Sequence, residues 1–416
     1  MLIDLLKDKK KFFGKVKFTP FLMQYPSPDL WSKNFSKSDF LDNILDLEIK
    51  DLNIYLHIPF CDYLCKYCSF SKILLKNDMI DKYFLGLEQE ISFWNKLLDF
   101  SKINIKTIFI GGGTPSVLNK QQIERLWTIF EKYNIKTDWE FSIETNPDRI
   151  DDNFKIWQNI WVNRISIWQQ TFNENVLKSQ NRNFIDFNNF SKKISFLRKI
   201  WFENINIDMI YGWDVENYNQ ILKDDIKKLS IILPEHISFY PLILYYKKLN
   251  NKELAGFFEK LEQQYDFISS NLDYNFYTLE YAIKKWLSQD YRHTYQVNYL
   301  KWENVLWFWP SWFSFLENIW FKNYFYLNEY LNAKFYPEYV YFVKNEIVDY
   351  QRKFILWLRL NIIEKKVVNY LENIGFLNKQ NLFIFDENYI LKPEYKKYQD
   401  LLLYYFNQKF NELSPY

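Results

Sequence analysis

Residues 55–70 read Tyr55-Leu-His57-Ile-Pro-Phe-Cys61-Asp-Tyr-Leu-Cys65-Lys-Tyr-Cys68-Ser-Phe70. This stretch contains all three cysteines of the 416-residue chain and begins with a short apolar run that predicts a β-strand. Three cysteines cannot form a closed set of disulfides, and an odd, tightly clustered count indicates metal binding. The spacing C-x3-C-x2-C therefore predicts a metal centre on a loop at the end of that strand.

The number of cysteines also bears on the kind of metal centre. Iron–sulfur clusters are held by cysteine thiolates, usually four. Because only three are present, one iron of a [4Fe–4S] cluster would remain free to bind another molecule. A zinc site of three cysteines with His57, or buried cysteines without metal, are the alternatives. Zinc sites usually add a second, distant pair of ligands, which this chain lacks, so the spacing favours the cluster.

Charge and hydropathy exclude several classes of partner. The chain has 53 basic and 51 acidic residues, a formal net charge of +2, so no overall field favours nucleic acid or an anionic membrane. The N-terminus lacks the apolar core and cleavage site of a signal peptide. No apolar run approaches the roughly 18 residues of a membrane helix, so we expect no integral membrane segment. Clustered, unpaired cysteines suit a reducing compartment, and a cytoplasmic location is predicted.

The composition has one anomaly, in glycine and tryptophan. The chain has 8 glycines and 16 tryptophans, whereas an average glycine share would give about 29. Trp307, Trp309 and Trp312 lie in a stretch that otherwise resembles a glycine-rich turn, and Trp161 and Trp168 flank a short strand pattern where turn residues belong. Our hypothesis is that the source organism reads UGA as glycine and that these codons are printed as Trp. The alternative is a genuinely Trp-rich protein with an aromatic pocket.

Apolar strand patterns alternate with amphipathic helix patterns over the middle of the chain. The predicted strands are Leu52–Ile58, Ile105–Ile110, Glu140–Thr145, Arg164–Ile167, Asn204–Ile210 and Ile237–Leu242. The predicted helices between them include Asp78–Leu98, Lys120–Lys132, Phe187–Lys199 and Tyr218–Leu229. Six strand–helix repeats predict a parallel sheet with right-handed crossovers. Closed into a partial barrel, such a sheet gathers its functional loops at the carboxyl ends of the strands.

Several polar residues fall at those strand ends. The triplet Gly111-Gly-Gly113, followed by Thr114, lets backbone amides approach a ligand without side-chain obstruction. Glu144 at the next strand end is suited to pair with an ammonium group, with an ordinary surface carboxylate as the alternative. Together with the cysteine loop, these motifs predict one functional rim.

Three further residues are candidates for ligand binding. Gln170 follows another predicted strand, and Arg182 could meet a carboxylate in bidentate geometry, although most arginines are simply solvated. Asp208 lies inside an apolar run, where a buried carboxylate needs partners that ribose hydroxyls would supply.

Taken in order, these motifs resemble the radical SAM family of oxygen-independent coproporphyrinogen III oxidase and its haem-chaperone relatives (HemN/HemW-like). The resemblance runs from about Phe18 to Phe315, with a looser match around Trp357. Its most specific parts are His57-Ile-Pro-Phe-Cys61, Ile110-Gly-Gly-Gly-Thr-Pro115, Asn163-Arg-Ile-Ser166 and Asp208-Met-Ile-Tyr-Gly212.

The resemblance implies specific roles and cofactors. Cys61, Cys65 and Cys68 would hold the [4Fe–4S] cluster. S-adenosylmethionine (SAM) would be bound by Tyr55, Gly112, Gly113, Thr114, Glu144, Gln170, Arg182 and Asp208. The implied partners are a porphyrin or haem and an external electron donor of the flavodoxin or ferredoxin type. No catalytic side chain is assigned.

The resemblance also implies an α/β fold. A partial (βα)6 radical SAM barrel at residues 51–285 would carry an N-terminal arm at 1–50 and a C-terminal helical domain at 286–416. The family typically has glycine where this chain has Trp161, Trp168, Trp201, Trp307, Trp309, Trp320 and Trp357, which strengthens the recoding hypothesis.

Phe70 bears on the branch of the family. The oxidase has a further cysteine at this position, so its absence favours a haem chaperone, which binds haem and passes it on. The long leader around Tyr25 resembles the oxidase instead. Three alternatives to a haem chaperone therefore stay open. They are the oxidase, an oxidoreductase like coproporphyrinogen dehydrogenase; an anaerobic haem-degrading radical SAM methyltransferase; and a haem carrier with vestigial SAM cleavage. We expect a radical SAM enzyme in porphyrin or haem metabolism. Of the histidines, His293 is our choice of haem ligand, because it matches a family histidine that precedes a glycine-rich turn. By its place in the motif His57 is expected beside the cluster, and His236 is at least as well explained as a core residue.

Overall fold

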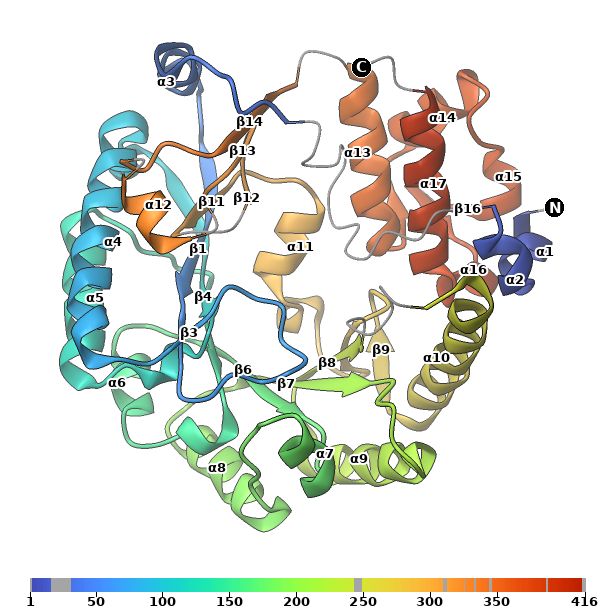
Figure 1. The fold of residues 1–416 in the computed structure, drawn as a ribbon, viewed down its shortest axis with the longest axis horizontal. Coiled ribbons are helices and arrows are strands. Elements are labelled where there is room, and N and C mark those ends of the chain that lie inside the picture. Colours follow the sequence, from blue (N-terminus) through green and yellow to red (C-terminus); the bar gives the residue numbers. More distant parts are fainter. Residues whose placement is uncertain are drawn as a thin grey trace.

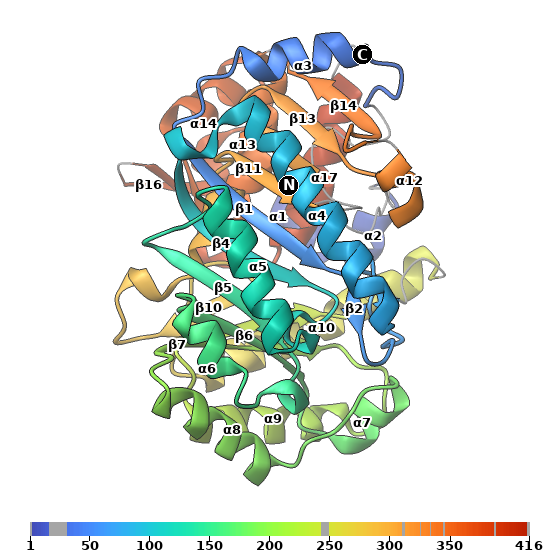
Figure 2. The same ribbon diagram turned by 90° about the vertical axis from the view of Figure 1, so that its left-hand side faces the viewer.

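The structure is a computed structural model that describes residues 2–15, 31–242, 249–309, 313–324, 326–332, 334–343, 346–386 and 388–413. A large sheet curves around the centre of the molecule, and helices cover its outer side (Figures 1 and 2). In the described chain its strand order is β14-β13-β12-β11-β1-β4-β5-β6-β7-β8-β10-β9. The predicted leader around Tyr25 lies outside the described residues.

Six parallel strands form the centre of this sheet. They are β1 (Asp51–Ile58), β4 (Asn104–Gly112), β5 (Glu140–Thr145), β6 (Arg164–Gln170), β7 (Asn204–Tyr211) and β8 (His236–Pro241). The helices that follow them are α4 (Asn77–Leu98), α5 (Lys120–Lys132), α6 (Phe154–Asn159), α7 (Glu174–Ser179) with α8 (Phe187–Lys199), α9 (Tyr218–Ile232) and α10 (Asn251–Asn271). The predicted partial (βα)6 barrel is confirmed, and β5, α5 and α8 have the predicted bounds.

Local sequence explains why these helices start where they do. Asn119 and Gln122 form a capping box at the start of α5, each side chain bonding the other residue's backbone N–H. Asp186 accepts a hydrogen bond from Asn189 N–H at the start of α8. Apolar residues at helical spacing then turn one face of each helix toward the sheet, as Ile123, Leu126 and Phe130 do in α5.

Antiparallel strands extend the sheet at both ends. The strands β10 (Tyr281–Lys284) and β9 (Tyr274–Phe276) continue from β8. On the other side β11 (Val305–Phe308) pairs in parallel with β1, and β12 (Phe313–Leu316), β13 (Ile319–Lys322) and β14 (Tyr339–Phe342) follow antiparallel. Residues 286–416, predicted as a separate C-terminal domain, thus add four strands to the barrel sheet.

The rest of the chain packs around the open side of the barrel. This part consists of the helices α13 (Glu346–Arg359), α14 (Lys365–Asn373), α15 (Lys379–Leu382), α16 (Pro393–Lys396) and α17 (Gln399–Leu413) and of a small sheet of β15 (Ile362–Ile363), β17 (Asn388–Leu391) and β16 (Phe383–Asp386). They form the helical region that we predicted (Figure 1). The short helix α12 (Leu327–Asn332) lies near α4, where the Tyr330 side chain lies beside the Glu90 carboxylate, and α11 (Thr294–Leu300) lies inside the ring of strands.

The described part of the predicted N-terminal arm packs in two places. The helices α1 (Leu2–Lys7) and α2 (Lys9–Phe13) lie against α10, where the Lys9 ammonium is 2.7 Å from the Glu262 carboxylate and the Phe13 ring contacts Phe258. The helix α3 (Lys37–Leu45) packs near α4, with the Phe40 ring edge-on to that of Trp94. Within the described residues, no helix combines the length and apolar character needed to cross a bilayer.

Candidate functional site

The three cysteines lie on a loop that begins just after β1, at the carboxyl end of the barrel strands. The loop runs between two short parallel strands, β2 (Phe60–Cys61) and β3 (Ile73–Leu74). The N–H groups of Ile73 and Leu75 donate to the carbonyls of Pro59 and Cys61, both at 2.8 Å. These bonds close the loop at its base and hold the cysteines together on one side of the barrel.

The cysteine loop is also anchored to the turn after α7 and to the segment after β5. Lys66 N–H donates to the Gln180 carbonyl at 3.1 Å, and the Asn181 side chain donates to the Leu64 carbonyl at 3.0 Å. Arg149 forms a two-pronged ion pair with Asp62, with Nε 2.6 Å from the carboxylate. The loop geometry is therefore fixed by protein contacts on three sides.

Two donors face the sulfur atoms. The Thr114 hydroxyl is 3.6 Å from Cys61 Sγ, and the Arg182 guanidinium is 3.7 Å from Cys65 Sγ. Burial raises the pKa of the Cys61 thiol to about 12. Metal ligation requires the thiolate, and hydrogen-bond donors around the sulfur stabilise that form. The environment of the cysteines thus fits a metal-bound thiolate set.

The spacing of the possible metal ligands distinguishes a site for a single metal ion from a cluster site. In the part of the chain that the structure describes, no three His, Cys, Asp or Glu side chains converge on a single ion position. A [4Fe–4S] cluster does not require such convergence, because each cysteine binds a different iron. His57 is engaged elsewhere, since its Nε2–H donates to the Ser71 carbonyl at 2.8 Å.

The glycine triplet at the end of β4 is required by close packing against β1 and β5. A Cβ at Gly111 would lie 2.4 Å from the Glu144 carboxylate, and one at Gly112 would lie 2.5 Å from His57 Nδ1. Gly112 also has a φ of 117°, which side chains disfavour. A Cβ at Gly113 would lie 2.6 Å from the Pro59 backbone, so the triplet admits no side chain.

Glu144 is held beside this triplet. Its carboxylate accepts a hydrogen bond from Gly112 N–H at 2.9 Å. Burial and the nearby charge of Asp208 raise the pKa of Glu144 to about 8. The Tyr55 hydroxyl lies next to the same glycines and 3.4 Å from His57 Nδ1. The structure therefore brings Tyr55, the triplet and Glu144 together beside the cysteine loop.

Arg182 and Thr114 are joined by Asn146, a residue to which the sequence analysis gave no role. The Asn146 amide donates to the Thr114 hydroxyl at 3.3 Å and accepts from Arg182 at 2.9 Å. Arg182 also donates to the Trp168 carbonyl. The signal for Asn146 was its place directly after Glu144-Thr145 at a strand end.

Gln170 and Asp208 lie on neighbouring strands but differ in their bonding. Gln170 follows a register shift at the end of β6, has a φ of 68°, and its buried Oε1 has no hydrogen-bond partner. An orphaned buried acceptor fits contact with a bound ligand. Asp208 instead accepts from Ser166 at 2.6 Å and from Asn206 at 2.8 Å. The protein supplies the partners that we expected from ribose, so burial alone does not require a ribose contact there.

A second buried polar group lies deeper in the barrel and was missed by sequence reasoning. The Glu140 carboxylate accepts from the N–H groups of Thr294 and Tyr295 at 2.7 and 3.2 Å, which caps α11 inside the barrel. Arg164 is fully buried, with Nε 4.0 Å from Glu140 and no hydrogen bond to its guanidinium. Its sequence signal was a charged residue opening a predicted strand.

All three histidines are buried. His236 bonds the Asn206 side chain and the Tyr277 hydroxyl, so it is a core residue as predicted. His293, our choice of haem ligand, packs against the Phe109 ring, and its Nε2 lies 3.6 Å from Glu140. The structure does not support this choice, because a haem iron has no access to a side chain enclosed in the barrel.

Of the tryptophans near the site, Trp307 does not lie in the turn that was predicted. Trp307 belongs to β11, and its ring stacks on Tyr55 with centroids 3.8 Å apart. Trp309 directly follows this strand, and Trp312 lies outside the described residues. The Trp168 indole N–H donates to Glu144. The expectation that these residues crowd a turn is therefore wrong for Trp307, which pairs with β1.

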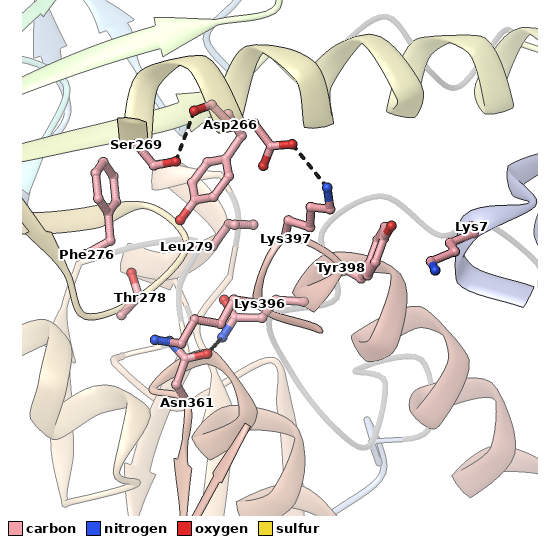
Figure 3. A pocket seen from close by; sticks show the side chains of 12 residues that line it. Lys7, Asp266, Ser269, Phe276, Thr278, Leu279, Asn361, Lys396, Lys397 and Tyr398 are labelled. Carbon is pink, nitrogen blue, oxygen red and sulfur yellow. Dashed lines mark hydrogen bonds and ion pairs between the residues drawn. The ribbon is translucent and has the colours of Figure 1, made fainter. Parts of the chain in front are cut away.

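A separate cavity of about 800 Å³ lies between α10, the β9–β10 hairpin and the segment around α16 (Figure 3). Lys397 and Asp266 form a 3.1 Å ion pair across it, and Tyr265 and Lys7 also line it. None of the cysteines and none of the predicted SAM-binding residues line this cavity.

Comparison with known proteins identifies relatives of this architecture. Residues 55–224 match the model of the radical SAM superfamily. The haem chaperone HemW of Lactococcus lactis is 34% identical over 263 residues, which cover 61% of this chain and 66% of the relative. The oxygen-independent coproporphyrinogen III oxidase of Salmonella typhimurium is 31% identical over 252 residues, which cover 58% of this chain and 54% of the relative. The matched stretch is thus less than two thirds of the length of either relative.

The fold has a counterpart among solved structures. The radical SAM enzyme coproporphyrinogen III oxidase (HemN) of Escherichia coli superposes with a TM-score of 0.75 at 20% identity, covering 94% of this chain and 97% of that one. At this identity the likeness concerns the fold alone.

Proposed function

The chain belongs to the radical SAM superfamily and, within it, to the family of HemN-type coproporphyrinogen oxidases and HemW-type haem chaperones, and on this basis we propose that it is a haem chaperone-like radical SAM protein. Membership of the superfamily implies a [4Fe–4S] cluster and SAM. The observation that carries the proposal is the cysteine loop, with Thr114 and Arg182 facing its sulfurs and Glu144 beside it.

The proposed ligands of the cluster are Cys61, Cys65 and Cys68. Their loop is closed by the β2–β3 pair and tied to the body by the Asp62–Arg149 ion pair. The cluster with SAM would supply the radical chemistry, while the protein contributes orientation and exclusion of water. A buried guanidinium at Cys65 and a hydroxyl at Cys61 would stabilise the thiolates.

The proposed SAM site lies between the cysteine loop and the strand ends. Glu144 is placed to accept a hydrogen bond from an ammonium group. The N–H groups of Gly113 and Thr114 donate to the carbonyls of Ile58 and Phe60, both at 2.7 Å, which holds the glycine triplet against the start of the cysteine loop. Gln170 offers its unpartnered carbonyl oxygen, and Tyr55 its hydroxyl beside Gly111. Asp208 completes the proposed set of SAM ligands, and hydrogen bonds from Ser166 and Asn206 hold its carboxylate in place.

The choice of the chaperone-like branch rests on Phe70. Its ring is 47% exposed at the edge of the cysteine loop, so no structural requirement of the core selects it. A phenylalanine there offers no thiol to a substrate. Haem, a porphyrin and an external electron donor remain proposed partners, supported by the names of the relatives.

The test uses the full chain reconstituted anaerobically with iron and sulfide. We expect about four irons per chain, a change in the EPR signal of the reduced cluster on addition of SAM, and formation of methionine and 5′-deoxyadenosine. Cys61→Ser, Cys65→Ser and Cys68→Ser should each lose the cluster, and Ser69→Ala is the matched control on the same loop. Uptake of one zinc per chain without iron would contradict the proposal.

Substrate assays separate the branches. The proposal predicts stoichiometric haem binding and no conversion of coproporphyrinogen III to protoporphyrinogen. Steady decarboxylation of coproporphyrinogen by the reconstituted protein would assign it to the oxidase branch instead.

A further inference from the structure

Four tryptophans adopt a backbone conformation that suits glycine. Trp161, Trp201, Trp302 and Trp309 have φ values of 75°, 71°, 67° and 91°. Among the described residues, 14 other than glycine have positive φ, and four of these are Trp and four are Asn. Asn tolerates this region because its side chain is short and bonds locally, whereas a bulky residue there is an outlier. Tryptophan should therefore be rare in this set, not equal to asparagine.

Three of the four occupy the same position in the same motif. Trp161 directly follows Ile160, the C-cap residue of α6. Trp161 N–H donates to the Gln158 carbonyl, and Val162 N–H donates to the Trp157 carbonyl. This pair of bonds is the Schellman motif, whose left-handed residue is usually glycine. Trp201 after α8 and Trp302 after α11 form the same two bonds.

Other helix ends of the same chain show which residue the motif selects. The same pair of bonds ends α14 with Gly375, α5 with Asn134 and α7 with Asn181. Packing does not explain Trp161 and Trp201, because their side chains are 72% and 78% exposed, whereas the Trp302 ring packs against Phe315. Within one chain, the position is thus filled by the two residues that suit it and by tryptophan.

Two further tryptophans occupy the candidate SAM site itself. The Trp307 ring covers the face of Tyr55 at 3.8 Å, and the Trp168 indole uses the Glu144 carboxylate as its acceptor. Both indoles therefore engage groups that the proposed function assigns to SAM. Glycine at 168 and 307 would uncover the Tyr55 ring and the Glu144 carboxylate.

We infer that the natural chain carries glycine at residues 161, 168, 201, 302, 307 and 309, through reading of UGA as glycine, and that the volume filled by the indoles of Trp168 and Trp307 is the cofactor cavity. The assignment of the cofactor cavity rests on the proposed function, whereas the assignment of glycine at these positions does not. The glycine count agrees, because 8 glycines and 16 tryptophans together approach the expected share of about 29. Trp320 in β13 and Trp357 in α13 have ordinary backbone angles, so the structure gives no conformational reason for glycine there.

The identity is tested on the gene and on protein from the source organism. We expect TGA codons at these six positions and peptides whose masses contain glycine. TGG codons, or tryptophan in the peptides covering residues 161, 201 and 302, would overturn the inference. This result is independent of any activity.

The argument from backbone conformation is tested with recombinant protein that carries tryptophan at these positions, expressed from TGG codons. Trp161→Gly with Trp201→Gly should raise the thermal midpoint by a few degrees, because the strain is relieved and little packing is lost. Gly375→Ala is the matched reverse change: it has φ 72° and no atom within 4 Å of an added Cβ, so it should lower the midpoint through the backbone alone. A midpoint lowered by the Trp→Gly pair would contradict the argument.

The cavity is tested by SAM binding to the reconstituted protein. Trp168→Gly with Trp307→Gly should bind SAM at least tenfold more tightly than the printed chain, whereas Trp161→Gly with Trp201→Gly should leave the affinity unchanged. If glycine is found in the natural protein but the opened variant binds SAM no better, the cavity assignment fails while the residue identity stands. If iron is not taken up by either chain, the proposed function fails instead.

Discussion

Gly112→Ala is expected to disrupt the site although it adds a single methyl group. The new Cβ would lie 2.5 Å from Nδ1 and 2.6 Å from Cε1 of His57. His57 cannot move aside easily, because it is fully buried and its Nε2 bonds the Ser71 carbonyl at 2.8 Å. The backbone at this position also has a φ of 117°, which an alanine rarely adopts.

The magnitude follows from two separate costs. A strained backbone conformation costs about 1–3 kcal/mol, and forcing an extra methyl group into a packed core costs about 1–3 kcal/mol more. The free energy of unfolding should therefore fall by about 2–6 kcal/mol. Urea denaturation followed by circular dichroism measures this change, and the same variant should hold less iron because the displaced backbone supports Thr114.

Gly256→Ala is the matched control. Gly256 lies inside α10 with no atom within 4 Å of an added Cβ, so alanine should stabilise the protein by about 0.5–1 kcal/mol. An effect of the same sign and size for both variants would refute the reasoning, as would a Gly112→Ala variant as stable as the parent chain.

Three further predictions concern the surroundings of the site. Burial raises the pKa of Glu90 to about 8. The folded chain therefore keeps a proton that the unfolded chain releases above about pH 4.3. As the pH rises toward 8, this group should lower the free energy of unfolding by about 1.4 kcal/mol per pH unit. Glu90→Gln should remove that slope in urea denaturation from pH 5 to 8, and an unchanged slope would exclude Glu90 as its source. Asp208→Ala should weaken SAM binding about tenfold or more in calorimetry without loss of iron, and equal affinity would remove Asp208 from the site. Arg149→Ala breaks a partly exposed ion pair with Asp62, which should contribute less than about 1 kcal/mol to stability. The thermal midpoint should therefore barely move, whereas the loss of iron to a chelator should become faster because the cysteine loop is less firmly anchored. Unchanged iron retention would count against anchoring of the loop by this pair.

The regular elements of the barrel were predictable from local pattern. Strand β5 and helices α5 and α8 have the predicted bounds because a cap residue or a change of hydrophobic period marks each end in the sequence. The cysteine loop and the glycine triplet were also predictable, since parallel strands place their carboxyl ends at one rim. These signals are local, so a single sequence contains them.

The bonding of individual site residues was harder to predict. Asp208 was expected to need ribose, but Ser166 on the neighbouring strand and Asn206 on the same strand already donate hydrogen bonds to its carboxylate. Asn146 and Arg164 were missed because their importance depends on which strands lie side by side. His293 was chosen by position in the chain, and only the packing around Phe109 shows that it is enclosed.

The sequence by itself determined the strand–helix alternation, the metal-binding loop and the anomaly in glycine and tryptophan. Only the tertiary structure decided that β11 pairs with β1, about 250 residues away in the chain, which turned Trp307 from a predicted turn residue into a strand residue over Tyr55. A four-residue strand has too short a pattern to reveal its partner, because pairing between distant strands is set by the packing of the whole sheet. The positive φ angles of Trp161, Trp201 and Trp302 likewise became visible only once the helices were folded, since a backbone angle is fixed by the bonds that close each helix end.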